Sequence, residues 1–167
     1  MNNTRPCKLV DLETLDLTKF KLEKNKIEFE HYTYECDEFI DGAQTADLLG
    51  LDHAIVYKTL VTVSPSKEYF VFVIGIDDEL DLKAAAKSVG QKSLAMIQVK
   101  DINNVTGYIR GGCSPVGMKK KYPTFFEESC QLYDEIAISA GERGHQMILP
   151  PLSLVELVNG TLEDIIV

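Results

Sequence analysis

Two apolar, β-branched segments in the middle of the chain constrain the fold more than any other feature of the sequence. Residues 55–63 and 69–76 are both rich in valine, isoleucine and aromatic residues, and the connection Ser64-Pro65-Ser66-Lys67 lies between them. A short connection of turn-forming residues between two such runs predicts a β-hairpin. The chain is therefore expected to build a sheet around this hairpin.

Shorter predicted elements surround the hairpin without a strict alternation of strand and helix. Strand patterns cover residues 27–34, 94–99, 136–139 and 146–149. Helical patterns predict an N-terminal helix of unclear limits, helices over residues 45–49, 82–89 and 152–158, and one helical turn over 101–105. We expect Gly50 and Gly90 to end two of these helices and Asp81 to begin one. This order favours one α/β domain with a mixed sheet, open or closed, and helices outside.

Composition excludes several classes of protein. The chain has 167 residues and a net charge of −9, which argues against strong nonspecific binding to nucleic acid, DNA included. No apolar run reaches the ~18–20 residues of a membrane helix, and Met1–Lys8 lacks a signal-peptide core, so a cytoplasmic location is expected. The four cysteines form no CxxC pair, and three scattered histidines do not suggest zinc, so we expect reduced thiols, no metal and no cofactor.

A glycine-rich segment is the first candidate for a functional site. Residues 111–117 read Gly-Gly-Cys-Ser-Pro-Val-Gly, within an irregular stretch over residues 108–121. Such a loop can bring its backbone close to a ligand and direct N–H groups at an anion or an oxyanion. The spacing of a P-loop is missing. The alternative is a tight surface turn.

Lys58 is the second candidate, because it interrupts the apolar strand Val56–Leu60. A lysine that points inward from such a strand is desolvated and needs a partner or a ligand. The alternative is a lysine on the solvent-facing side of the strand.

The third candidate is the turn Ser139-Ala140-Gly141-Glu142-Arg143-Gly144, which begins at the end of a predicted strand. Ser139 could donate a hydrogen bond to a ligand there, and the alternative is an ordinary hairpin turn. Cys113 is a conceivable nucleophile, with His145 as the one candidate base near a glycine turn. We do not expect this pair to act, because no catalytic histidine can be assigned.

Charge is distributed unevenly along the chain. Residues 108–121 hold four basic side chains and no acid, a local charge of +4 against −13 on the remainder. A basic segment beside a glycine loop, on an acidic protein, suggests that something anionic docks there. The alternative for the lysine run is a solvated face.

Taken together, these segments resemble the YbaK-type trans-editing deacylases, which are related to the editing domain inserted in bacterial prolyl-tRNA synthetases. The resemblance runs from about Lys19 to Ile165 and rests on five motifs in family order. They are Tyr57-Lys58-Thr59-Leu60, Leu82-Lys83-Ala84-Ala85-Ala86-Lys87, Thr106-Gly107-Tyr108, Gly111–Gly117 followed by Lys119-Lys120, and Ser139-Ala140-Gly141 with Arg143-Gly144.

The resemblance implies a single α/β domain over residues 19–167, with a barrel-like mixed sheet surrounded by helices. Residues 1–18 are then an N-terminal extension without an assigned role. The implied activity is hydrolysis of the ester of a mischarged tRNA, most of all Cys-tRNA(Pro). The implied partners are the tRNA acceptor end, bound weakly, and prolyl-tRNA synthetase in a transient complex. Two alternatives stay open: another specificity on this fold, such as Ala-tRNA(Pro), and a noncatalytic module that binds a tRNA end or a synthetase.

The resemblance also assigns residues by position, with Lys58 and Gly111 as the catalytic pair. By the same resemblance Tyr34 and Ser139 bind the substrate, and the glycine loop and the strand-end turn add Gly112, Ser114, Pro115, Gly117, Gly141 and Arg143 as substrate-binding candidates. The charge of the basic segment, rather than the resemblance, assigns contacts to tRNA to Arg110, Lys119, Lys120 and Lys121. This chain has Gln146 where some members carry an acidic residue. In this family the cysteinyl substrate uses its own thiol to attack its ester, which accounts for the lack of a Ser-His-Asp arrangement here.

Overall fold

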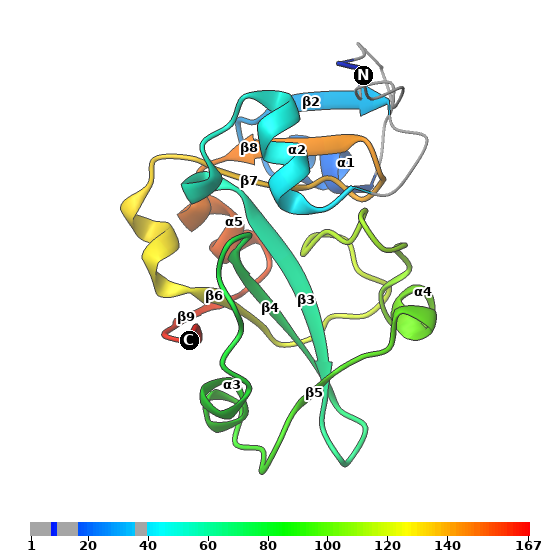
Figure 1. Cartoon of the computed structure of the whole chain (residues 1–167), viewed down its shortest axis with the longest axis vertical. Coiled ribbons are helices and arrows are strands. Elements are labelled where there is room, and N and C mark those ends of the chain that lie inside the picture. The colour runs from blue at the N-terminus through cyan, green and yellow to red at the C-terminus, as the bar shows by residue number, and fades with distance from the viewer. Residues whose placement is uncertain (1–7, 10–16, 36–39) are drawn as a thin grey trace, which may run out of the picture.

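The predicted hairpin forms the long central feature of the molecule (Figure 1). The structure, a computed structural model, describes residues 8–9, 17–35 and 40–167, and the side chains from residue 21 onward within these ranges. Strands β3 (Tyr57–Val63) and β4 (Tyr69–Gly75) pair antiparallel along their whole length. Six consecutive residues of β4, from 70 to 75, are buried, which explains why its sequence is apolar without alternation.

The hairpin belongs to a mixed five-stranded sheet with the order β5-β3-β4-β6-β9. Strand β6 (Thr124–Glu127) pairs parallel with β4, and β9 (Thr161–Glu163) pairs parallel with β6. The strand expected over residues 94–99 is reduced to β5 (Ala95–Met96). The chain then turns into a short 3-10 helix, η2 (Val99–Asp101), and α4 (Ile102–Thr106).

A second, antiparallel sheet has the order β1-β2-β8-β7. Its strands are β1 (Lys8–Leu9), β2 (Glu30–Glu35), β7 (Ile136–Ser139) and β8 (His145–Leu149). An isolated parallel bridge between Val56 and Ala137 joins the two sheets. The expected mixed α/β domain is thus confirmed, with its sheet in two parts that meet at this bridge.

Local sequence signals explain the helices. Helix α2 (Gly42–Leu49) begins with a capping box between Asp41 and Gln44 and ends at Gly50 in the left-handed conformation, φ 67°. Asp81 caps α3 (Leu82–Ser88), as expected, and α5 (Pro151–Leu157) begins with a proline. The remaining helical segments are α1 (Leu17–Lys24), η1 (His53–Ile55) and η3 (Glu128–Leu132).

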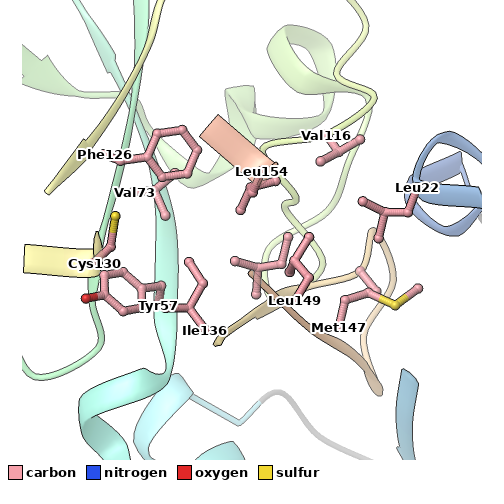
Figure 2. Packing of buried hydrophobic residues seen from close by; sticks show 12 residues of the cluster. Leu22, Tyr57, Val73, Val116, Phe126, Cys130, Ile136, Met147, Leu149 and Leu154 are labelled. Carbon is pink, nitrogen blue, oxygen red and sulfur yellow. The ribbon is translucent and has the colours of Figure 1, made fainter. Parts of the chain in front are cut away.

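The largest hydrophobic core ties both sheets to the glycine loop (Figure 2). Val73 and Phe126 enter it from the five-stranded sheet, and Met147 and Leu149 from the antiparallel sheet. Val116, inside the glycine-rich segment, is only 1% exposed and belongs to the same core. The loop is therefore anchored at its far end by hydrophobic burial, although it has no regular structure.

The N-terminal extension expected over residues 1–18 lies mostly outside the described residues. Its described part includes β1, which pairs with β2 so that Leu9 lies opposite Tyr34. None of the helices in the described ranges has the length and apolarity that crossing a bilayer requires.

Candidate functional site

Lys58 and Ser139 occupy equivalent positions on two strands that run side by side. Val56, the residue directly before β3, and Ala137 of β7 form the parallel bridge between the sheets, and Lys58 and Ser139 each follow by two residues. Side chains two residues apart in a strand point to the same face. Val56 and Ala137 pack with Ala46 of α2, so Lys58 and Ser139 lie on the face that α2 covers.

Two more polar side chains share this face. Gln146 of β8 lies opposite Ser139 on one side and Tyr32 on the other, and Tyr34 follows Tyr32 by two residues in β2. The Tyr34 hydroxyl contacts the Thr45 hydroxyl of α2 at 3.4 Å. The face beneath α2 thus combines apolar packing with a row of polar groups from four strands.

The Lys58 ammonium is half-buried and is held by the segment that follows β4. It donates hydrogen bonds to the carbonyl oxygens of Asp78, at 2.8 Å, and Ile76, at 3.2 Å. An ammonium has three donors, and carbonyls do not neutralise its charge. Lys58 therefore presents a positive charge to the face of the sheet without an ion pair among the described residues.

The glycine loop approaches this face through Gly111. Its carbonyl accepts a hydrogen bond from the Ser139 hydroxyl at 3.3 Å, and its φ of 88° is one that residues with a side chain rarely adopt. Gly117 and Gly141, also assigned from the sequence, have φ values of 76° and 102°. Within the described residues the Gly111 N–H is not used by any backbone hydrogen bond, whereas the Gly112 N–H donates to the Ile109 carbonyl.

The turn after β7 packs directly on the loop. A side chain at Gly112 would meet the backbone of Glu142 at 3.0 Å and of Arg143 at 3.2 Å. The Arg143 guanidinium donates to the Arg110 carbonyl at 2.8 Å. The structure thus brings together the loop and the turn that the sequence identified separately.

Tyr34 is fixed by the same turn. Its backbone N–H donates to the Gly144 carbonyl at 2.8 Å, and a side chain at Gly144 would collide with the Tyr34 carbonyl. Tyr34 is 7% exposed. Gly144 is therefore required for its small size as well as for its φ of 87°.

Ser114 and Pro115 shape the loop from inside. Both are buried, and the Ser114 hydroxyl accepts a hydrogen bond from the Val116 N–H at 3.1 Å. The Tyr108 hydroxyl donates to the Val116 carbonyl in a short hydrogen bond. These two hydrogen bonds hold the loop through its own residues, which is the kind of preorganisation that an oxyanion site requires.

Gln146 was not among the site residues predicted from the sequence. It is 7% exposed, and its amide oxygen accepts no hydrogen bond from the described residues. A buried acceptor without a donor costs about 1–3 kcal/mol. An unpaired acceptor at the centre of a polar face is typical of a group that a ligand satisfies. In the sequence, only the departure of Gln146 from the family pattern distinguishes this residue.

The geometry does not support a Cys113–His145 pair. Burial raises the pKa of the Cys113 thiol to about 11, although a hydrogen bond with Thr106 lowers it in part. His145 Nδ1 contacts His31 Nε2 at 2.9 Å, and His145 Nε2 lies 3.5 Å from Glu142. Both ring nitrogens of His145 thus face groups other than Cys113.

The predicted basic segment divides into two parts. Arg110 lies with Arg143 beside the loop, whereas Lys119 packs against Gly107 at the end of α4. Lys119, Lys120 and Lys121 are all exposed. The described residues also include a cluster of three carboxylates that could hold a cation. It consists of Glu127, Glu128 and Asp164, none of which belongs to the elements of the candidate site.

The fold and this site define an aminoacyl-tRNA editing protein, because the family model described as "Aminoacyl-tRNA editing domain" matches residues 40–157. The chain belongs to this family, and the expected enzyme class, an aminoacyl-tRNA deacylase, is confirmed. It is 41% identical, over 86% of its length and 88% of the relative's, to EbsC of Enterococcus faecalis. That relative is provisionally named a Cys-tRNA(Pro)/Cys-tRNA(Cys) deacylase.

Further comparisons find one more relative and two solved structures with the same fold. Part of the proline–tRNA ligase of Shouchella clausii is 28% identical, over 63% of this chain and 18% of the ligase. A crystal structure described provisionally as a trans-editing enzyme for prolyl-tRNA synthetase matches with a TM-score of 0.77 at 20% identity, covering 92% of this chain and 99% of the other. A hypothetical protein matches with a TM-score of 0.82 at 17% identity, over 91% and 100% of the two chains. These two structures show the fold alone.

Proposed function

We propose that this protein removes the amino acid from mischarged tRNA, with Cys-tRNA(Pro) as its substrate. The name of the E. faecalis relative and the likeness to part of a proline–tRNA ligase support this choice. The single observation that carries the assignment is the convergence of Lys58, Ser139 and Gln146 on one face beside the Gly111 loop.

The chemistry needs little more than these groups. An aminoacyl ester is already activated, so its hydrolysis depends on stabilising the negative charge that develops on the carbonyl oxygen. The Gly111 N–H can donate to that oxyanion, because it makes no backbone hydrogen bond among the described residues. The Gly112 N–H cannot, because it already donates to the Ile109 carbonyl. Lys58 supplies a positive charge for the oxyanion or the nearby phosphodiester.

The nucleophile in this proposal is the thiol of the substrate. Its sulfur forms a bond to the ester carbon, the ester C–O bond breaks, and the thiol proton passes to the departing ribose oxygen. Water then opens the resulting thiolactone. Cys113 takes no part, because a thiol with a pKa of about 11 is protonated near neutral pH.

Gln146 is suited to receive the substrate amine. Its buried amide oxygen needs a donor, and an α-ammonium group offers three. Tyr34, held by Gly144 and Thr45, lies on the same face of the sheet, two residues after Tyr32, which is opposite Gln146. The amine would then be recognised by a neutral acceptor, next to the hydroxyl of Ser139.

Selection of the tRNA body is assigned to a partner protein. A net charge of −9 repels a polyanion at long range, and the exposed cations of the glycine loop and its neighbouring turn, Arg110, Arg143 and Lys119 to Lys121, can neutralise few phosphates. The protein alone should therefore bind the aminoacylated 3′ end weakly. Prolyl-tRNA synthetase in a transient complex would supply the preference for tRNA(Pro).

The test is a panel of mischarged tRNAs. Release of amino acid is measured from Cys-tRNA(Pro), Ala-tRNA(Pro) and Cys-tRNA(Cys), with and without prolyl-tRNA synthetase. We expect cysteine to be released from both tRNA bodies by the protein alone and preferentially from tRNA(Pro) when the synthetase is present. Release of alanine but not cysteine would replace the proposed specificity, and no release from any tRNA would leave a binding module.

A further inference from the structure

A histidine outside the proposed site connects two of the segments that build it. His53 lies in η1, directly before β3, and its side chain is 34% exposed. Its Nε2 lies 2.7 Å from the Asp47 carboxylate of α2, and its Nδ1 lies 3.1 Å from the Asp77 carboxylate after β4. One imidazole ring therefore bridges helix α2 and the segment after β4 that holds Lys58.

The contact with Asp77 reaches Lys58 through the backbone. Asp77 stands between Ile76 and Asp78, whose carbonyls accept the two hydrogen bonds of the Lys58 ammonium. The Ile76 N–H donates to the Val56 carbonyl at 3.0 Å, which ties this segment to the start of β3. A displacement of Asp77 would therefore shift both acceptors that orient Lys58.

The contact with Asp47 reaches the other side of the site. Asp47 lies two residues after Thr45, which contacts the Tyr34 hydroxyl, in the same short helix. Gly42, at the start of this helix, packs so closely on Ile76 that a side chain there would meet the Ile76 methyl group at 2.5 Å. Helix α2 and residues 76–78 are thus in contact at Gly42 and are bridged a second time through His53.

We propose that His53, in its doubly protonated form, is a positioning residue that clamps α2 to residues 76–78 and so fixes Lys58 for deacylation. The proposal rests on the proposed function for the role of Lys58. An imidazolium has two N–H donors and can serve both carboxylates. A neutral imidazole has one, so it leaves a lone pair facing the second carboxylate.

The charges around His53 favour the clamped form. Hydrogen bonding to Asp47, then to Asp77, raises the pKa of His53 above its ordinary value of about 6.5. Asp47 faces it from α2 and Asp77 from the β4–α3 connection, while Asp52 on its own element caps the Ala54 N–H at 2.9 Å. Because the pKa is raised in the folded protein, the clamp is present at lower pH and is lost as the pH rises through that pKa.

The experiment compares the wild type with His53→Gln, which keeps an amide donor but cannot become charged. The kcat/KM for Cys-tRNA(Pro) is measured for both proteins from pH 5.5 to 9, and their ratio is taken at each pH. The ratio cancels the intrinsic pH dependence of the ester and the substrate thiol. Asp77→Asn and Asp47→Asn are the partner variants, and circular dichroism checks that all of them fold.

We expect the wild type to exceed His53→Gln at low pH, by up to about 10²-fold, since misplacement of a catalytic group by about 1 Å can cost that much. The ratio should approach one as the pH passes the pKa of His53. Each Asp→Asn variant should lower that pKa, read from the His53 ring signals by NMR. A ratio that does not change with pH in active proteins would overturn the proposal.

A second reading separates this proposal from the proposed function. The backbone amide signals of Ile76, Asp77 and Asp78 should titrate with the pKa of His53 in the wild type and not in His53→Gln. Amides that do not follow His53 would overturn the clamp, whatever the activity. A wild type without deacylase activity at any pH would instead contradict the proposed function, and the amide titration alone would then decide whether the clamp exists.

Discussion

The hydroxyl of Ser139 donates a hydrogen bond to the carbonyl of Gly111, 3.3 Å away, and so connects the end of β7 to the glycine loop. This bond turns the Gly111 carbonyl toward the strand and helps to fix the loop beside the face that carries Lys58. The two residues are 28 positions apart in the sequence and belong to different motifs. Their contact unites the motifs into one site.

Ser139→Ala should lower kcat/KM about tenfold without unfolding the protein. A single neutral hydrogen bond contributes about 0.5–1.5 kcal/mol, and a loss of about 1.4 kcal/mol corresponds to a factor of ten. The matched control is Ser88→Ala, because the Ser88 hydroxyl also donates to a backbone carbonyl, that of Ala84, within α3. Equal activity losses in both variants would show that the effect is not specific to the loop.

Gly111→Ala should reduce kcat by about 10²–10³-fold, the loss expected for one oxyanion donor. Alanine is strained at a φ of 88°, so the loop must twist to accept it. Gly90→Ala is the control, since Gly90 has a φ of 70° and open space around it. Gly90→Ala should lower the thermal unfolding temperature about as much as Gly111→Ala does, and it should leave kcat unchanged. Full activity in Gly111→Ala would remove the loop from the mechanism.

Cys113→Ala should retain most of the activity. The buried thiol has a pKa raised to about 11, so its reactive thiolate is scarce at neutral pH and increases only as the pH rises toward that value. Alkylation of Cys113 by iodoacetamide should accordingly be slow at pH 7. An inactive alanine variant, or an aminoacyl group trapped on Cys113 and seen by mass spectrometry, would contradict the proposed mechanism.

Gln146→Leu should raise KM for the aminoacyl-tRNA by about tenfold or more while stability stays equal or increases. The substitution removes a buried acceptor that has no donor among the described residues, and it keeps a similar volume. Opposite effects on binding and stability mark a group reserved for a ligand. A loss of stability with an unchanged KM would instead assign Gln146 a purely structural role.

Local signals in the sequence predicted much of this fold. The structure confirms the hairpin β3–β4, the caps at Asp81 and Gly50, and the strand over residues 136–139. These features were predictable because each depends on residues that are neighbours in the sequence. Strands β6 and β9 were missed. They are short and lie in parallel register with partners far away in the chain, so no local pattern marks them.

The site was predictable as separate motifs but not as an arrangement. The glycine loop and the turn after β7 are visible in the sequence, whereas the contact of Gly112 with Glu142 depends on tertiary packing. The carbonyl acceptors of Lys58 lie about twenty residues further along the chain. The burial of Gln146 depends on the helix that covers its face of the sheet. The composition and periodicity of the sequence around it therefore could not predict that burial.

Lys58 is the residue on which the proposed activity depends most. Lys58→Met keeps the aliphatic stem and removes only the ammonium group, so the apolar packing of β3 should persist. The two carbonyls that it releases, those of Ile76 and Asp78, lie in a half-buried segment where water can replace the donor. The variant should therefore fold, with an unchanged circular dichroism spectrum.

The most direct measurement is the rate of cysteine release from Cys-tRNA(Pro) by equal amounts of wild type and Lys58→Met. The wild type should release cysteine rapidly, and the folded variant should not exceed the rate of the ester in buffer alone. Wild-type turnover by a folded Lys58→Met protein would contradict the proposed site and its mechanism.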